Sequence, residues 1–244
     1  TLPTADPLFH FARAIVEATA DLVCAYKPNL AFWLAEGADG LRQLAHTITA
    51  IPDPIPVILD GKFNDIGNTA AAYARAAFET LSADAVTANP YLGLDGLRPF
   101  LTSADHGLFL LARTSNPSAP DLQDRPVDGQ PLYQVVAQLA TRWNAETPAA
   151  CGLVVGATYP DELRLLRQIA PDLPFLIPGV GAQGGSLEAA VAYGPTSGER
   201  EIGPVINASR AILYASPGAD FATAARAASL SLRDRINQAR EERE

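Results

Sequence analysis

The chain alternates short apolar, β-branched runs with amphipathic stretches along most of its length. The short runs predict buried strands, and apolar residues three or four apart predict helices with one buried face. Strict alternation of this kind produces a parallel sheet with right-handed crossovers, either open and doubly wound or closed as a barrel. The strands that we expect are Leu22–Tyr26, Pro56–Leu59, Ala85–Ala88, Leu108–Ala112, Gly152–Gly156, Phe175–Pro178 and Pro204–Ala208.

The number of repeats favours the barrel. Helical patterns surround Phe11 to Ala18 before the first expected strand and Phe221 to Ala239 after the last. With one strand ahead of residue 1 the pattern would hold eight β/α units, and about 250 residues is the usual size of such a barrel. We therefore expect residues 1–244 to form a single (β/α)8 TIM-barrel domain whose first strand is missing from the sequence. An open sheet is the alternative, although no Gly-x-Gly-x-x-Gly motif follows an early strand.

Composition excludes several classes of protein. The net charge is −9 at pH 7 and no basic run occurs, which argues against nucleic-acid binding. The sequence has no long apolar span and no signal-like start, so we expect neither a membrane protein nor a secreted one, and we favour the cytoplasm. Cys24 and Cys151 lie in apolar runs and are expected to be small core side chains in a reducing compartment. His10, His46 and His106 lack the spacing of metal ligands, so we expect no metal site.

Lysine is scarce, with only Lys27 and Lys62 against sixteen arginines. Each lysine follows an apolar run, where a barrel carries its chemistry. Arginine stays protonated near neutrality whereas lysine can release a proton, so these two positions suggest a need for an ammonium group. We expect Lys27 and Lys62 to lie on the same face of the barrel.

An acid, a base and a second acid follow the expected strand that ends at Leu59. Asp60 and Lys62 are two residues apart and should share one face of the strand end, while Asp65 lies in the turn that leads to the next helix. This spacing predicts a catalytic cluster. The structural alternative is that Asp65 or Asn68 caps the helix and that Asp60 and Lys62 form a barrel-end ion pair.

Two loops near the end of the chain together predict a phosphate site. Pro178-Gly-Val-Gly-Ala-Gln183-Gly-Gly185 and Asn207-Ala-Ser-Arg210 each follow a strand directly. Glycine-rich turns expose backbone N–H groups, and Arg210 adds a rigid fork of donors. The last two strands of a barrel are the usual place for phosphate binding. Taken singly, each segment could be ordinary turn chemistry.

A third candidate region begins at Ser115, after the expected strand Leu108–Ala112. A Pro- and Asp-rich loop runs from there to about Gly129, which is longer than most βα loops. Its length favours a binding loop or lid, and a tolerated surface insertion is the alternative.

These segments together resemble orotidine 5′-monophosphate decarboxylases. The resemblance lies in Asp60-x-Lys62-x-x-Asp65-Ile66-x-x-Thr69, in Gly179-Val-Gly-Ala-Gln-Gly-Gly185 and in Ser209-Arg210. Lys27-Pro-Asn-Leu-Ala-Phe32, Thr87-Ala-Asn-Pro-Tyr-Leu-Gly93 and Thr114-Ser-Asn-Pro117 resemble the type 2 subfamily of bacteria and archaea. The resemblance extends through most of the chain.

The resemblance implies an α/β TIM barrel that acts as a homodimer on a nucleotide, with no metal and no cofactor. It implies that Lys62 protonates C6 of the pyrimidine beside Asp60. It also implies that Asp65 is a second acid, which the partner subunit supplies together with Ile66 and Thr69. Lys27 is implied to contact the ribose and Ser115 the pyrimidine. The implied phosphate site consists of Pro178, Gln183 and Arg210. The family's first strand carries a ribose-binding aspartate, and no residue before Lys27 can take that role.

Two other functions stay open from the residues. A magnesium-dependent sugar-phosphate decarboxylase or aldolase of the same barrel superfamily shares the Asp-x-Lys-x-x-Asp strand end. A non-catalytic barrel that binds a phosphate ligand is the other alternative, because the expected ribose aspartate is missing.

Overall fold

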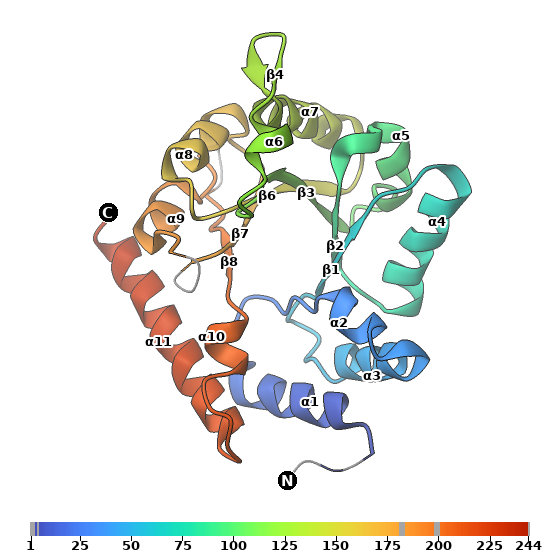
Figure 1. Ribbon diagram of the computed structural model, residues 1–244, viewed down its shortest axis with the longest axis vertical. Helices are drawn as coiled ribbons and strands as arrows, with labels where there is room; N and C mark the ends of the chain where they lie inside the picture. The colour runs from blue at the N-terminus through green and yellow to red at the C-terminus, as the bar shows by residue number, and fades with distance from the viewer. Residues whose placement is uncertain (1–2, 4, 181–183, 198–200, 244) are drawn as a thin grey trace.

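Parallel strands form one curled sheet in the order β1, β2, β3, β6, β7, β8, surrounded by helices (Figure 1). The computed structural model describes residues 3, 5–180, 184–197 and 201–243. In the described chain the strands of this sheet are β1 (Ile58–Phe63), β2 (Ala85–Ala88), β3 (Gly107–Arg113), β6 (Ala150–Val155), β7 (Phe175–Pro178) and β8 (Val205–Asn207). All five pairings are parallel, as the alternating sequence predicts.

The inner face of the sheet holds its own small core. Neighbouring strands each contribute one side chain that points into the barrel, and together these pack as a cluster of Ile58, Ala85, Phe109, Val154 and Leu176. Such a layer is how the interior of a TIM barrel is filled. Gly152 makes room for the largest member, because a Cβ there would lie 2.7 Å from the ring of Phe109. The sheet therefore encloses a packed interior.

A larger core lies between the sheet and the helices that follow its strands. The longer helices are α1 (Pro7–Thr19), α3 (Gly37–Thr49), α4 (Gly67–Arg75), α7 (Leu132–Glu146), α8 (Pro160–Ile169), α9 (Leu187–Tyr193) and α11 (Phe221–Glu241). Shorter ones are α2 (Leu30–Leu34), α5 (Leu94–Leu97), α6 (Pro120–Gln123) and α10 (Arg210–Leu213), and single turns η1 (Ala76–Thr80), η2 (Pro90–Leu92) and η3 (Arg98–Phe100) complete the set. None of the helices in the described ranges is long and apolar enough to cross a membrane.

The expected strand Leu22–Tyr26 is wrong as a regular strand. This segment runs beside β1, but it is joined to it through isolated bridges at Tyr26 and Asn29. Pro28 lies between them and has no backbone N–H, so the ladder is interrupted. The remaining expected strands are present, although β1 starts at Ile58 and continues through Asp60 and Lys62 to Phe63. Among the described residues, the arc is open between this segment and β8 (Figure 1).

The two cysteines differ in environment. Cys151 is fully buried in β6, as expected, and burial raises the pKa of its thiol to about 11. Cys24 is exposed, so the expectation of a core side chain is wrong there. It lies in the irregular segment beside β1, where no strand covers it in the described chain. Neither cysteine forms a disulfide.

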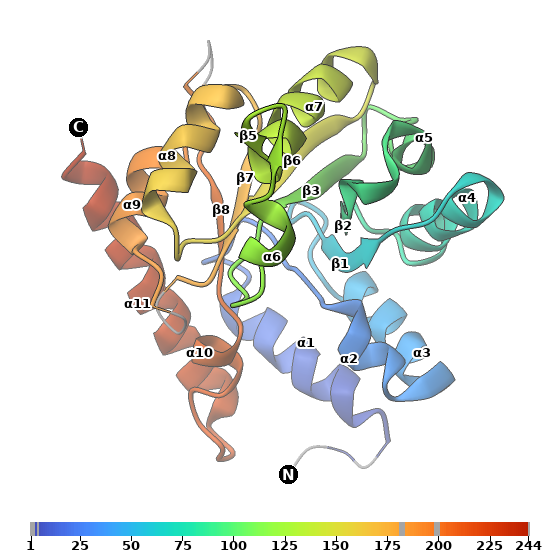
Figure 2. The ribbon, with the colours of Figure 1, turned by 45° about the horizontal axis from the view of Figure 1, so that its top comes forward.

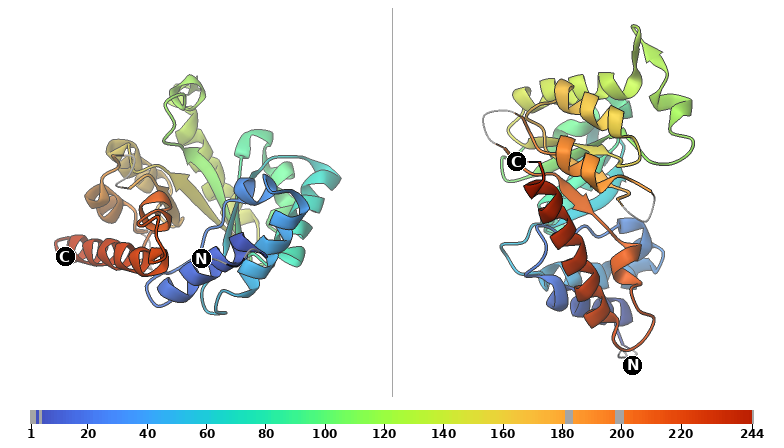
Figure 3. Two further views of the ribbon diagram at one scale, coloured as in Figure 1. Left: turned by 60° about the horizontal axis from the view of Figure 1, so that its bottom comes forward. Right: turned by 90° about the vertical axis from the view of Figure 1, so that its left-hand side faces the viewer.

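The long connection after β3 projects from the carboxyl end of the barrel (Figure 2). It contains α6 and a small antiparallel hairpin of β4 (Pro126–Val127) and β5 (Gln130–Pro131) before α7 begins. Figure 3 shows that this hairpin stands clear of the rest of the molecule. The connection is therefore a structured excursion, which we call the β3 excursion (residues 114–131).

Candidate active site

The carboxylate of Asp60 is the centre of a polar cluster at the carboxyl end of β1. Its Oδ1 accepts hydrogen bonds from Lys62 Nζ at 2.6 Å and from Thr87 Oγ1 at 2.8 Å. Its Oδ2 accepts from Lys27 Nζ at 2.6 Å and from Asn29 Nδ2 at 3.4 Å. The two scarce lysines thus lie on one face of the barrel, as expected, and they share one acid.

Burial differs sharply among the members of this cluster. The side chains of Asp60 and Lys27 are 8% and 15% exposed, whereas that of Lys62 is 50% exposed. Burial tends to raise the pKa of Asp60, but the two neighbouring ammonium groups outweigh it and hold that pKa below its usual value. Asp60 is therefore a fixed negative charge at neutral pH, and Lys62 is the member of the pair that a ligand can reach.

The backbone directs Lys62 toward this acid. Lys62 has a φ of 47°, in the left-handed region that a non-glycine residue occupies only at a cost of about 1 kcal/mol. The register between β1 and β2 shifts between Leu59 and Phe63, as at a β-bulge. The backbone N–H of Lys62 donates to Thr87 Oγ1 at 3.0 Å, which secures the irregular turn. Bulges of this kind redirect side chains near active sites.

Asp65, Ile66 and Thr69 do not join this cluster within the single chain. Among the described residues Asp65 forms no ion pair, and its Oδ1 accepts from the backbone N–H of Ile66 at 2.8 Å. No side chain caps α4, so the capping alternative does not hold. Ile66 and Thr69 are exposed at the start of α4. Asp65 itself is half-buried.

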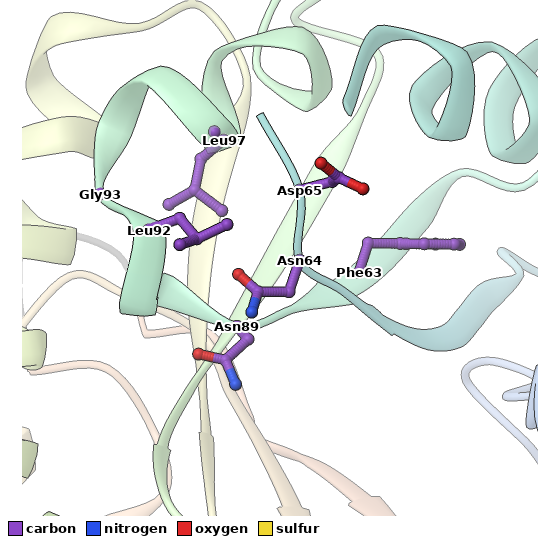
Figure 4. Close-up of a pocket in the computed structure, with 8 residues that line it drawn as sticks. Phe63, Asn64, Asp65, Asn89, Leu92, Gly93 and Leu97 are labelled. Carbon is purple, nitrogen blue, oxygen red and sulfur yellow. The ribbon is translucent and has the colours of Figure 1, made fainter. Parts of the chain in front are cut away.

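The backbone around Asp65 packs tightly against α5. Gly96 is buried there, and a Cβ on it would come within 2.8 Å of the carbonyl oxygen of Asp65. A shallow hollow between the ends of β1 and β2 is lined by Asn64, Asp65 and Asn89, among others. In Figure 4 the side chain of Asn64 points toward Asn89, whereas the carboxylate of Asp65 points away from both. Gly96 thus sets how closely the Asp65 turn approaches its neighbour.

The two glycine-rich and arginine-bearing loops are neighbours, as expected. Pro178 at the end of β7 pairs in register with Asn207 at the end of β8, so the loops that follow start side by side. Gly185 donates its N–H to Gly179 O at 3.1 Å, and a Cβ there would lie 2.6 Å from that oxygen. Arg210 is exposed at the start of α10. Gln183 lies outside the described residues.

Ser115 is half-buried just beyond the end of β3. Gly156, at the end of β6, lies against it, and a Cβ on that glycine would be 3.2 Å from the Cβ of Ser115. Gln123 of α6 holds the adjacent residue at two points, because it accepts from Thr114 N at 2.9 Å and donates to Thr114 Oγ1 at 2.7 Å. The start of the β3 excursion is thereby placed at the same end of the barrel as Asp60.

The sequence motifs do not single out several residues that support the site. Thr87 and Asn29 occur there only as parts of longer segments, yet both donate hydrogen bonds to Asp60. A threonine within the apolar run Ala85–Ala88 was the available signal for the first. Arg113, a charge directly after the apolar run Leu108–Ala112, was a similar signal. Nothing in the sequence pattern marks Gly96, because its contact is with a residue thirty-one positions away.

In the described ranges, no three His, Cys, Asp or Glu side chains are grouped so that they could hold a metal ion. The donors around Asp60 are ammonium, amide and hydroxyl groups, which suits a buried carboxylate that serves as an acceptor.

A curled parallel sheet with charged residues gathered where its strands end defines a TIM-barrel enzyme. Comparison of the sequence with known protein families identifies the family. Residues 7–227 match the orotidine 5′-phosphate decarboxylase / HUMPS family. The chain belongs to this family.

Individual relatives agree with this assignment. The chain is 56% identical over 234 residues to orotidine 5′-phosphate decarboxylase of Thermomicrobium roseum, a match that covers 95% of this chain and 82% of that protein. It is 54% identical over 243 residues to the Cellvibrio japonicus protein of the same name, covering 98% and 87%. The structure of Leishmania donovani OMP decarboxylase superposes with a TM-score of 0.86 at 40% identity, covering 98% of this chain and 90% of that one.

Proposed function

We propose that this protein decarboxylates orotidine 5′-phosphate to uridine 5′-phosphate in pyrimidine biosynthesis. The observation that carries the proposal is the half-exposed ammonium of Lys62, 2.6 Å from a buried Asp60, at the carboxyl end of a parallel barrel. The family membership supports the same reaction, because its relatives are named orotidine 5′-phosphate decarboxylase.

The reaction needs a cation beside C6 of the pyrimidine. When the bond from C6 to the carboxylate breaks, CO2 leaves and the electron pair stays on C6 in an orbital that is not conjugated with the ring. A fixed positive charge can stabilise this carbanion electrostatically. Lys62 then donates a proton to C6 and becomes a neutral amine, which regains a proton from solvent. A lysine can do this near neutral pH, whereas an arginine cannot.

Asp60 keeps Lys62 charged and oriented before the reaction. A substrate carboxylate roughly 4 Å from a bare carboxylate would be repelled by about 4 kcal/mol at an effective dielectric of 20. Four donors already surround Asp60, from Lys27, Asn29, Lys62 and Thr87, so much of its charge is compensated. We therefore assign Asp60 chiefly to the preorganisation of Lys62, with repulsion of the substrate as a smaller contribution.

The remaining substrate contacts follow from the places of the other residues. We assign Lys27 to the ribose and Ser115 to the pyrimidine. Pro178, Gln183 and Arg210 are assigned to the phosphate. Pro178 and Arg210 are supported by the register that joins β7 to β8, and the exposed guanidinium of Arg210 is available to an anion. Phosphate binding remote from C6 can supply energy that organises the site around Lys62.

A homodimer would complete the site. Large apolar side chains are exposed around α2, α4 and η2, where Phe32 is 77%, Ile66 54% and Tyr91 71% exposed. Exposed apolar residues that gather on one side of a molecule mark interaction surfaces. We propose that this surface pairs with a second copy, so that Asp65, Ile66 and Thr69 of each chain reach the partner's site.

Disruption of that surface gives a test of the dimer. The double substitution Phe32→Asp and Tyr91→Asp should shift the protein to monomers and lower turnover in parallel, because charged residues oppose apolar packing across an interface. Sedimentation analysis and turnover should be measured over the same range of protein concentration. Ile202→Asp, at a side chain that is also 45% exposed, should change neither and is the matched control. A monomeric variant with full turnover would contradict the proposed dimeric site.

The function itself is tested by a direct assay. Purified protein with orotidine 5′-phosphate should show loss of the substrate's ultraviolet absorbance and release of CO2, with equal rates with and without a chelator. A rate abolished by chelation and restored by Mg²⁺ would favour the sugar-phosphate type of chemistry instead. Tight binding of uridine 5′-phosphate without CO2 release would favour a binding protein and contradict the proposal.

We further propose that residues 1–244 act as one barrel domain in the cytoplasm. The continuous sheet from β1 to β8 and its common core support a single domain. The unpaired cysteines Cys24 and Cys151 support a reducing compartment.

A further inference from the structure

Arg113 is a buried charge whose side-chain contacts lie outside the cluster around Asp60. It is the last residue of β3, and its side chain is 2% exposed. Burial of a guanidinium is costly unless acids or ring faces compensate it. A buried arginine at the carboxyl end of a barrel strand, two residues before Ser115, therefore calls for a reason.

Four side chains surround this guanidinium. Its Nη1 lies 2.9 Å from Asp124 Oδ1, just after α6, and its Nη2 lies 3.8 Å from Glu162 Oε1, in the first turn of α8. Its Cζ lies 4.0 Å from the ring centre of Tyr159 and 5.4 Å from that of Tyr133 in α7. Arg113 thus ties the β3 excursion to the helices on both sides of it.

Further contacts connect Arg113 to Thr114 and Ser115, at the start of the β3 excursion. Gly156 donates its N–H to Arg113 O at 2.8 Å, and Gly156 also lies against Ser115. Gln123, one residue before Asp124, holds Thr114 through two hydrogen bonds. The guanidinium of Arg113 therefore acts on Ser115 through Asp124 and the adjacent Gln123, whereas Gly156 is held by the backbone carbonyl of Arg113, which any residue at this position would supply.

The anchor is not fully satisfied in this structure. Nε and Nη1 of Arg113 are buried and form no hydrogen bond among the described residues, since the approach of Asp124 is not aligned for one. The contact with Asp124 is therefore an ion pair without an aligned hydrogen bond, and Glu162 and two ring faces surround the rest of the guanidinium.

We propose that Arg113 is a positioning residue for the decarboxylation, which holds Ser115 and the β3 excursion against α8 in the geometry that binds the pyrimidine. This inference rests on the proposed function, because Ser115 is assigned there to the pyrimidine. Arg113 itself does not touch the substrate in this assignment and acts through Ser115.

A second buried arginine provides a matched control. Arg167 is 6% exposed, and its Cζ lies 3.7 Å from the ring centre of Phe175. It donates to the carbonyl oxygens of Ala170, Leu173 and Gly194, at the opposite end of the barrel where strand β7 begins. Arg167→Met should lower stability and leave kcat and KM per folded molecule unchanged.

The test is a double-mutant cycle between Arg113 and Ser115. Ser115→Ala should lower kcat/KM for orotidine 5′-phosphate about tenfold in the wild-type background and less than about twofold in Arg113→Met, because coupled residues are not additive. In the Arg167→Met background the loss should stay about tenfold. Equal losses in the wild-type and Arg113→Met backgrounds would overturn the inference. If Arg113→Met does not fold, Asp124→Asn takes its place in the same cycle.

Failure of the function and failure of the inference can be told apart. If the wild-type protein does not turn over orotidine 5′-phosphate, the proposed function fails. Hydrogen exchange in the ligand-free protein then decides the structural part. Exchange across residues 114–131 should rise in Arg113→Met and stay at the wild-type level in Arg167→Met. Unchanged exchange in Arg113→Met overturns the inference.

Discussion

Lys62→Ala is expected to lower kcat for orotidine 5′-phosphate by about 10⁴-fold or more while the protein stays folded. The variant loses both the proton donor and the cation beside C6, and each of these contributes about two orders of magnitude or more. Lys27, Asn29 and Thr87 still donate to the buried Asp60 in this variant, so the urea midpoint should fall only by the share of the ion pair that the half-exposed Lys62 supplies. Single-turnover kinetics measure the loss, and near-normal turnover would remove the basis of the assignment.

Arg210→Ala is the informative comparison for Lys62→Ala. It removes a cation from the proposed phosphate site and leaves the cluster around Asp60 intact. KM should therefore rise more than kcat falls, the opposite of the expected pattern for Lys62→Ala. If both variants lost kcat alone, the separation of phosphate binding from proton transfer would be wrong.

Asp60→Asn is expected to lower kcat strongly and also to destabilise the fold. The substitution keeps the shape of the side chain but leaves Lys27 and Lys62 without their shared counter-charge. Two unit charges roughly 6 Å apart repel by about 3 kcal/mol at an effective dielectric of 20. Lys62 would then be held less firmly beside the substrate. Asn29→Ala removes a weaker donor to the same carboxylate, at 3.4 Å, and should have a much smaller effect on kcat. Its cost in stability should be about 1 kcal/mol, because Asn29 also caps α2 by accepting from the backbone N–H of Ala31.

The pH dependence of stability gives a second measurement on Asp60→Asn. The pKa of Asp60 is lowered in the folded protein, so the folded state binds this proton less tightly than the unfolded state does. The stabilisation is therefore present above the ordinary aspartate pKa of about 3.9 and is lost as the pH falls through the lower, folded value. The stability advantage of the wild type over Asp60→Asn should shrink below about pH 4. A constant difference from pH 7 to pH 2 would contradict the ion-pair role of Asp60.

Sequence periodicity predicted most of the elements because it reflects local burial. The expected strands Ala85–Ala88 and Phe175–Pro178 match β2 and β7, and the apolar spacing from Leu132 to Trp143 matches α7. The expectation at Leu22–Tyr26 was wrong because the pattern of apolar residues does not show where the pairing is broken. Here Tyr26 is already level with Val57, just before β1 begins at Ile58, so residues 22–25 have no strand of the described chain to pair with on that side. Pro28 then interrupts the ladder beyond Tyr26.

The sequence by itself determined the class of fold and the strand ends that carry polar chemistry. Both depend on residues close together in the chain, and parallel strands place their carboxyl ends at one edge. Only the tertiary structure decided that Lys27 and Lys62 share Asp60, that Lys62 adopts a left-handed turn against Thr87, and that Arg113 joins α6 to α8. These contacts depend on the register and curvature of the sheet, which bring together residues that are far apart in the sequence.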